Sequence, residues 1–582
     1  MPFLALALLL LAAPSFADPA SSELASSELA SLSARVPSFR VVDLPATGAV
    51  TLKPEQSLTI ESLRGVPLDD RPPVLGKPPA FPENMTNDCQ PGKEPYIARD
   101  IAPFRFRQFD LEFNYGGWHN WAMIDYASAH GFNIISPYNR APAKWTELPP
   151  GTKHLSWGNF VDWDKWMPEH KIPAGRYDKL TDIDVAAKLF AAHALKRNPG
   201  FDLLMIDMEH GVLNPNALRQ QPWYPKDAAP AARQAFERKY YTGYGLTFLA
   251  PLQAARKEGW KSVGVYGWQP FPRQWWGLEK ATADPATDWA WNGFGKAIYE
   301  AADVLYPDVY CFYWSPQDIA YQLTNLDFCR KLTASTGRQK PMRPYYWTLL
   351  HGGDATKHWW TNQPLATEEA RAMTAFCFFT GCDGLVQWNW SDVGSHQVAP
   401  EAKYDTDVMV GKRFEAQARD TDPDKVKPTV FERYDMLHIV QVRGNGTTFF
   451  QPIEKTNYKD YGLSPDKPSY ELPFSSAPYL RAPAEPISGV IEGLALVKPL
   501  EYILRHAEVK VDIPAQEQFA KTLPIVRRMK LGTLNVIATY DPQVVFGSPP
   551  RDIVLTDFDG HKGLTLTLPA DAQTRLFVLR SQ

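Results

Sequence analysis

Apolar and polar positions follow two alternating patterns through the middle of the chain. Short apolar runs, typical of buried strands, are followed by longer stretches in which apolar residues recur every three or four positions, as in amphipathic helices. The eight runs that predict strands are Phe109–Asn114, Phe132–Pro137, His154–Trp157, Leu203–Ile206, Lys261–Gly267, Val304–Phe312, Arg343–Leu349 and Gly384–Trp390. Helices are expected at Trp118–His130, Asp182–Arg197, 229–258, Trp291–Ala302, Gln317–Ser335 and Thr367–Thr380.

Repeated strand–helix units imply a parallel sheet. Eight strand positions between residues 101 and 400 favour an α/β fold in which the sheet closes into a (β/α)8 TIM barrel. An open, doubly wound sheet is the alternative. It is disfavoured because Asn114–Gly117, after the first strand, lacks the glycine spacing of a phosphate-binding loop.

The rest of the chain divides into further regions. Residues 1–17 are an apolar run ending in Ser15-Phe16-Ala17, the small-x-small pattern of a signal peptide cleavage site, so we expect a secreted or periplasmic protein. A low-complexity and Pro-rich extension (18–100) precedes the barrel (101–400), and a connecting region (401–485) follows it. Residues 486–582 are expected to form an antiparallel β-sandwich. The strand-like runs beyond residue 425 are Met436–Val442, Leu534–Tyr540, Asp552–Leu555, Leu564–Leu568 and Arg575–Leu579.

Composition narrows the classes of partner. A net charge of −4 offers no basic surface for nucleic acid, and no segment after the signal peptide is long enough to span a membrane. Aromatic residues reach 13% of the chain, including 19 Trp, which is unusual for a soluble enzyme fold. The five Cys fit an oxidising compartment without requiring it, and their pairing stays open.

Two carboxylates lie at the end of the fourth strand. Asp207 and Glu209 are two positions apart, so the period-2 geometry of a strand puts them on one side. Two adjacent like charges are expected to raise one pKa, which is how a general acid is obtained near neutral pH. The alternative is a pair of solvated acids at a strand exit.

The active site of such a barrel lies at the carboxyl ends of its strands. The residues at those ends predict an acidic centre ringed by aromatic side chains, a composition that suits the flat faces and hydroxyls of a sugar. A polysaccharide or oligosaccharide is therefore the expected partner. The residues at the strand ends are Glu112, Asn114, Asp207, Glu209, Tyr266, Trp268, Tyr310, Trp314, Tyr346, Trp347, Trp388, Trp390 and Asp392.

Neither a metal nor a cofactor is expected. The chain has no His-Glu-x-x-His and no Cys-x-x-Cys motif, and His210 and His351 are more simply read as hydrogen-bonded residues near strand ends. A serine nucleophile is also unsupported, because no Gly-x-Ser-x-Gly elbow is present.

Five segments in order resemble the hyaluronidase family, glycoside hydrolase family 56, and related chitinase-like Asp-x-Glu glycosidases. Met205–Glu209 is similar to the family's strand-four Asp-x-Glu motif, and Ala302–Tyr310 to its Asp-Val-Leu-x-Pro-Ser-Val-Tyr segment. The other three segments are Val263–Trp268, Arg343–Trp347 and Gly381–Trp388. The resemblance covers roughly residues 200–395.

The resemblance implies a glycoside hydrolase that acts inside a chain containing N-acetylhexosamine. Glu209 would be the general acid/base, and Asp207 would orient the substrate's acetamido group for attack on the anomeric carbon, with retention. Tyr310 would bind the acetamide, Tyr266 would lie near the leaving group, and Trp388 would form the pocket floor. Two alternatives stay open: cleavage of a non-acetylated polysaccharide with a second carboxylate such as Glu112 or Asp392, and a non-catalytic carbohydrate-binding barrel.

Overall fold

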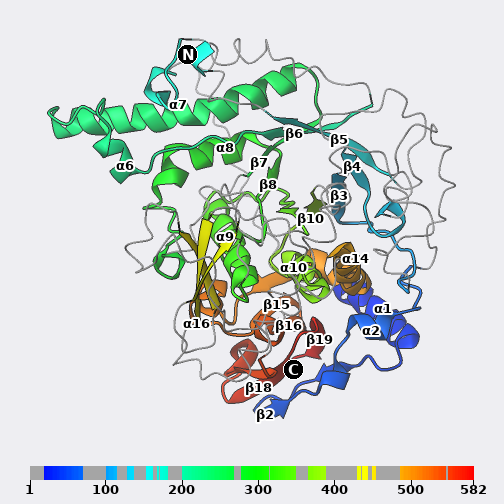
Figure 1. Ribbon diagram of the computed structural model, residues 1–582. Coiled ribbons are helices and arrows are strands. Elements are labelled where there is room, and N and C mark those ends of the chain that lie inside the picture. The colour runs from blue at the N-terminus through cyan, green and yellow to red at the C-terminus, as the bar shows by residue number, and fades with distance from the viewer. Residues whose placement is uncertain are drawn as a thin grey trace, which may run out of the picture.

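The structure is a computed structural model, shown in Figure 1. It describes residues 19–69, 100–114, 127–136, 152–160, 167–169, 171–180, 200–267, 277–312, 315–348, 365–388, 429–433, 436–442, 448–453, 486–545 and 548–582. The expected signal peptide and the helices expected at Trp118–His130 (apart from its last residues) and Asp182–Arg197 lie outside these ranges.

Eight parallel strands form a barrel at the centre of the molecule (Figure 1). The strands are β3 (Asp110–Asn114), β4 (Ile134–Ser136), β5 (His154–Phe160), β6 (Leu203–Asp207), β7 (Ser262–Tyr266), β8 (Val304–Tyr306), β9 (Tyr345–Tyr346) and β10 (Gly384–Gln387). They are paired in the order β8-β7-β6-β5-β4-β3-β10-β9, with every pairing parallel. Two further parallel bridges, Leu305–Met342 and Asp308–Tyr345, connect β8 to β9 and close the ring. The expected barrel is therefore found.

Helices cover the outside of the barrel. They are α7 (Pro230–Lys257), α8 (Lys296–Ala301, preceded by a π-helical turn at Trp291–Gly295), α9 (Asp318–Ala334) and α10 (Thr367–Phe379). Their apolar faces join one large core with the outward-facing strand residues. A short helix, α6 (Pro215–Gln220), follows β6, and Figure 1 shows it extending with the start of α7 beyond the barrel strands.

Helix α14 (Pro486–Val497) packs along α10 through glycines. A Cβ at Gly489 would lie 2.4 Å from the carbonyl oxygen of Thr367, so the two backbones approach closely. The contact also holds a buried ion pair, because the Arg371 guanidinium donates to the Glu492 carboxylate with both side chains nearly inaccessible to solvent. This helix ties the C-terminal part of the chain to the barrel.

The C-terminal region contains two facing sheets with an apolar layer between them, so a sandwich is present, but it is only partly antiparallel. The five-stranded sheet has the order β1-β19-β16-β15-β14 and the three-stranded sheet the order β17-β18-β2. The C-terminal strands are β14 (Glu508–Lys510), β15 (Ile525–Leu531), β16 (Leu534–Tyr540), β17 (Arg551–Leu555), β18 (Leu564–Ala570) and β19 (Arg575–Arg580). The pairings β14–β15, β15–β16, β16–β19 and β17–β18 are antiparallel. The expected antiparallel sandwich is therefore found in part, because β1 (Val41–Asp43) and β2 (Gly48–Thr51) add parallel pairings to β19 and β18.

The N-terminal residues thus complete the C-terminal sheets. Helix α1 (Pro19–Arg35) contacts α15 (Glu501–His506), and α2 (Ile60–Leu63) contacts α14. A separate antiparallel sheet is made of β11 (Thr429–Arg433), β12 (Met436–Val442) and β13 (Thr448–Ile453).

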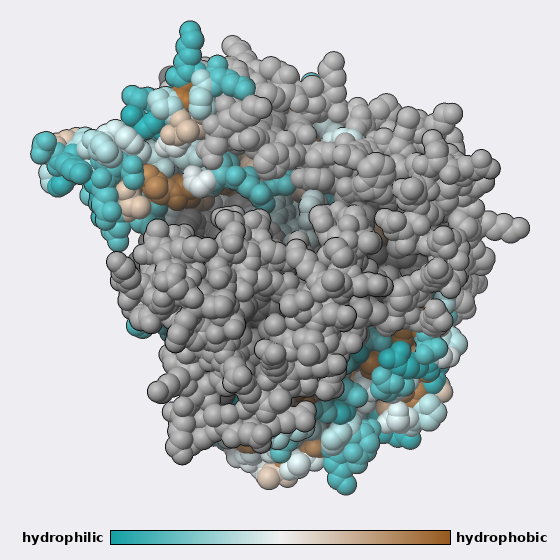
Figure 2. All heavy atoms as spheres, viewed as in Figure 1, coloured by the Kyte–Doolittle hydropathy of each residue, from teal (hydrophilic) through white to brown (hydrophobic). Residues whose placement is uncertain are grey.

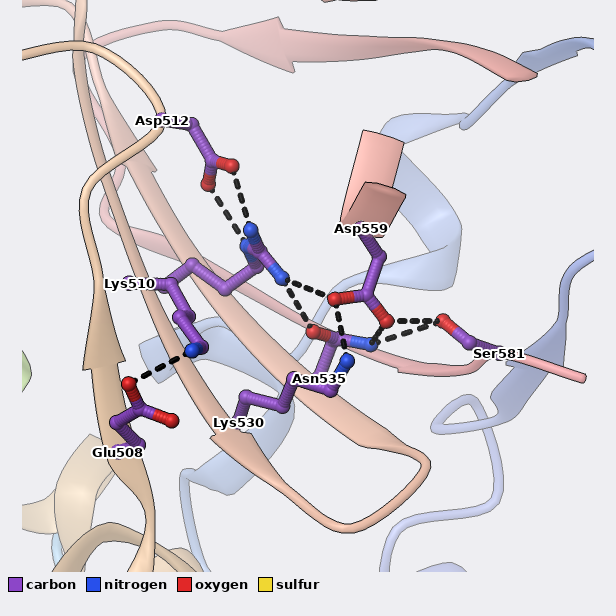
Figure 3. A network of polar contacts seen from close by, with 8 residues as sticks. Glu508, Lys510, Asp512, Lys530, Asn535, Asp559 and Ser581 are labelled. Carbon is purple, nitrogen blue, oxygen red and sulfur yellow. Dashed lines mark hydrogen bonds and ion pairs between the residues drawn. The ribbon is translucent and has the colours of Figure 1, made fainter. Parts of the chain in front are cut away.

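A buried polar network fastens one end of the five-stranded sheet (Figure 3). Arg528 on β15 donates to both oxygens of Asp512, at 2.6 and 2.8 Å, and to Asp559 at 2.9 Å. Asp559 also accepts from Lys530, Asn535 and Ser581, at 2.6, 3.2 and 2.9 Å. Burial acts to raise the pKa of Asp559, but these four donors outweigh it and lower that pKa to about 2.

Two features bear on the sequence expectations about cysteines and membranes. Cys311, Cys329, Cys377 and Cys382 are buried free thiols, whereas Cys89 lies outside the described residues. Within the described ranges, none of the helices combines the length and the apolar character needed to cross a bilayer.

Candidate active site

Alternate residues of the barrel strands point into the barrel and form one cluster. Its buried members are Met205, Tyr266, Val304, Tyr306, Tyr310, Tyr345 and Val386. Phe312, Trp347 and Trp388 pack against it and are partly exposed. Glycine makes room for this cluster, because a Cβ at Gly264 would lie 2.4 Å from the Tyr306 ring.

Asp207 and Glu209 lie at the carboxyl end of β6, as their positions in the sequence predict. Asp207 is the last residue of the strand and its side chain is buried, with 7% of the residue exposed. Glu209 follows two residues later and is exposed. One carboxylate of the pair therefore lies inside the barrel and the other faces solvent.

Tyrosines surround this pair. The ring of Tyr266, at the end of β7, lies 6.2 Å from the ring of Tyr310 and 4.9 Å from that of Tyr345. Burial raises the pKa of Tyr310, and the charges of Asp308, Asp207 and Glu209 raise it further. Burial also raises the pKa of Tyr266, with added effects of Tyr310, Asp308 and Glu209. Both phenols therefore stay protonated and can donate hydrogen bonds at this end of the barrel.

Asp308 is a third carboxylate of this cluster that the sequence analysis did not select. It lies just beyond β8, partly buried, in the bridge with Tyr345 that closes the ring. Burial raises its pKa to about 6, and the Glu209 charge contributes to that rise. It stands where the hyaluronidase segment quoted above has Ser, so this chain departs from that motif at this position.

Two of the expected tryptophans lie at the rim of the same cluster. Trp347 is in edge contact with Tyr310, with ring centroids 6.0 Å apart, and Trp388 lies 5.9 Å from Tyr345. The remaining expected rim residues, Trp268, Trp314, Trp390 and Asp392, lie outside the described residues.

Tyr346 does not belong to the site, which corrects its selection as a substrate-binding residue. Successive residues of a strand point to opposite sides, and here Tyr345 faces the interior of the barrel. Tyr346 is fully buried between the barrel and its helices, where Cys311, Glu369 and Cys377 are neighbours. A substrate at the mouth of the barrel has no access to it.

Glu112 and Asn114 point into the barrel from β3 and are fully buried. Burial raises the pKa of Glu112 to about 7, against the opposing effects of Arg343, Ser156 and Ser136. Glu112 is opposite Val386 in the strand register, below the end of the sheet, whereas the amide of Asn114 donates to Ser136 at 3.4 Å at the strand end. Glu112 therefore belongs to the floor of the barrel rather than to its mouth.

His210 faces away from the mouth and packs against α7. Its Nε2 is 2.8 Å from the Thr247 hydroxyl, and its ring stacks on Phe248 with centroids 5.2 Å apart. Burial lowers the pKa of His210 to about 3, so the ring is neutral at physiological pH. The interpretation of His210 as a hydrogen-bonded core residue fits this position.

The described residues contain no group of three or more His, Cys, Asp or Glu arranged to hold a metal ion. A surface cavity of about 370 Å³ lies between α6 and the start of α7, with Arg219, Lys226 and Arg233 in its walls. It is on the projecting arm, whose surface is largely hydrophilic in Figure 2, and not at the barrel mouth.

No family model and no curated protein matches the chain. Among solved structures it is similar to bee venom hyaluronidase, with 18% identity and a TM-score of 0.29 over 38% of this chain and 73% of that one. The complex of that enzyme with a hyaluronic acid tetramer gives 18% identity and a TM-score of 0.29 over 40% and 75% of the two chains. A GH5-4 broad-specificity endoglucanase from Clostridium acetobutylicum matches at 10% identity and a TM-score of 0.24, over 48% and 87%.

Proposed function

We propose that this protein is a glycoside hydrolase that cleaves a polysaccharide at the carboxyl end of the barrel. The observation that carries the proposal is the meeting of Asp207 and Glu209 with Tyr266 and Tyr310 at one mouth. An exposed carboxylate beside a buried one provides a proton donor and an orienting group, and phenol donors hold sugar hydroxyls or an amide.

In the proposed reaction Glu209 protonates the leaving oxygen, and Asp207 orients a 2-acetamido group of the substrate so that its carbonyl oxygen attacks the anomeric carbon. Water then opens the cyclic intermediate with net retention. Tyr310 binds the acetamide, Tyr266 lies near the leaving group, and Trp347 and Trp388 provide flat apolar surfaces for sugar rings. This mechanism requires an N-acetylhexosamine, and endo action is expected from the resemblance to hyaluronidases.

The signal-like N-terminus agrees with an enzyme that meets its polymer outside the cytoplasm. A non-catalytic carbohydrate-binding barrel is the competing class. The presence of both Asp207 and Glu209 favours the enzyme, because binding alone does not require a proton donor.

The test is reducing-sugar release by the purified chain on hyaluronan, chondroitin, chitin oligomers and non-acetylated polymers. We expect Glu209→Gln to reduce turnover by at least about 10²-fold without loss of folding, because general acid catalysis typically contributes that much. Glu258→Gln, at the exposed end of α7, is the matched control and keeps full activity. Equal rates for Glu209→Gln and the control would refute the assignment, and sugar binding without hydrolysis by the wild-type chain would favour the binding barrel.

A further inference from the structure

The carboxylate of Asp308 has no role in a substrate-assisted reaction. That mechanism uses the acetamido oxygen of the substrate as the nucleophile and needs only Asp207 and Glu209. Yet Asp308 lies in the same cluster, near enough for Glu209 to affect its ionisation.

Strand geometry fixes the side to which Asp308 points. Tyr306 and Tyr310, two positions before and after it, are both in the interior cluster. The same period of two turns Asp308 inward, and its bridge to Tyr345, another interior residue, holds it at that level. The groups that face it are Glu209 from the end of β6, Tyr266 from β7 and Tyr310 from its own segment.

The two carboxylates come from segments that are separated by one strand of the barrel. Asp308 and Glu209 follow strands that are two positions apart in the ring, β8 and β6, with β7 between them. Two inter-strand spacings amount to about 9–10 Å between backbones. Carboxyl groups about 6.5–9.5 Å apart are those that leave room for water between a general base and the anomeric carbon.

Building on the proposed function, we propose that Asp308 is a second catalytic carboxylate, a general base that lets this enzyme also hydrolyse glycosides without a 2-acetamido group. Glu209 donates its proton to the glycosidic oxygen as the bond between that oxygen and C1 breaks. Asp308 removes a proton from water as the water oxygen bonds to C1 on the opposite face. One water is consumed, C1 is inverted, and solvent returns the proton from Asp308 to Glu209.

The protonation behaviour of Asp308 agrees with this role. Its pKa of about 6 leaves it ionised at neutral pH, and a base with a pKa close to the working pH is an efficient one. Burial is the main cause of that value, so the Asp308 carboxylate is less solvated and more basic than an ordinary surface aspartate.

The experiment compares chitotetraose with cellotetraose, which share ring and linkage and differ in the 2-acetamido group. We expect the wild-type chain to cleave both, and Asp308→Asn to lose at least about 10²-fold on cellotetraose while chitotetraose changes only a few-fold. Glu209→Gln should lose activity on both substrates. Asp303→Asn, at the other end of β8, is the control for an Asp to Asn change in this segment.

The outcomes separate this inference from the function on which it rests. If the wild-type chain cleaves chitotetraose alone, the role of Asp308 is overturned but the glycosidase assignment is not. Equal loss of activity on both substrates in Asp308→Asn leads to the same conclusion. Retention at C1 in the cellotetraose product, followed by NMR, also overturns the general-base role. If the wild-type chain hydrolyses nothing in the wider panel, the proposed function itself fails. If Asp308→Asn does not fold, Asp308→Glu replaces it, and an unchanged ratio of the two rates then overturns the inference.

Discussion

The polar network around Asp559 predicts a measurable, pH-dependent part of the stability of the C-terminal sheets. Asp559 is only 4% exposed in its side chain and accepts hydrogen bonds from four residues (Figure 3). Its pKa falls from 3.8 to about 2 because those donors favour the charged form more than burial opposes it. Each unit of difference is worth about 1.4 kcal/mol, so the ionised carboxylate contributes about 2.5 kcal/mol at neutral pH.

Asp559→Asn removes that charge without changing the shape of the side chain. We expect the free energy of unfolding to fall by about 2.5 kcal/mol at pH 7, seen as a lower melting temperature. Because the pKa is lowered on folding, the contribution is complete above the unfolded value, shrinks below about pH 4 and is lost as the pH falls through about 2. The two proteins should therefore converge in acid.

Calorimetry at several pH values measures the difference, and hydrogen exchange on β15 and β16 shows where it arises. Asp552→Asn is the control, because Asp552 is exposed on β17 of the same unit. An Asp559→Asn variant that melts with this control at pH 7 would show that the donors around Asp559 do not stabilise its charge. A difference that persists unchanged at pH 2 would show that packing, not ionisation, is responsible.

Two further perturbations test other buried groups. Burial lowers the pKa of His210 to about 3, so below pH 6.5 the unfolded chain binds a proton that the folded chain does not. The free energy of unfolding therefore falls by about 1.4 kcal/mol for each unit of decreasing pH. His210→Gln should flatten this slope in unfolding curves at pH 7, 6 and 5, and an unchanged slope would contradict the burial of a neutral ring. Glu492→Gln removes the charge that compensates Arg371 between α10 and α14, and it should lower the free energy of unfolding by about 3–5 kcal/mol. The loss should be seen as faster hydrogen exchange in Pro486–Val497. Glu517→Gln, which breaks an exposed pair, should lower the free energy of unfolding by less than about 1 kcal/mol, and similar exchange in the two variants would contradict the role of the buried pair.

The barrel was predictable because its signals are local. Runs such as Leu203–Ile206 are apolar throughout, as strands covered on both faces must be, and the structure has β6 there. Boundaries were less predictable. The run from Val304 was expected to continue to Phe312, but β8 ends at Tyr306 because Pro307 has no N–H to donate to a neighbouring strand.

Partners that are distant in sequence had no such signal. The short run Val41–Asp43 pairs with β19, more than 500 residues later, and nothing in three residues specifies that neighbour. An antiparallel sandwich was expected from the C-terminal runs alone. The sandwich is mixed because β1 and β2 add parallel pairings to it.

Strand parity, by contrast, was available in the sequence and decides two site residues. Trp347 and Tyr346 were both assigned to the mouth, yet neighbours in a strand cannot face the same side. Because Trp347 faces the interior cluster, Tyr345 rather than Tyr346 is the tyrosine that faces it too. The same rule applied backwards from Tyr310 predicts that Asp308 faces the same side, although Asp308 is not among the residues expected at the strand ends. A barrel mouth is therefore better predicted from every second residue of each strand than from strand ends alone, and that reading turns the expected pair of carboxylates into a set of three.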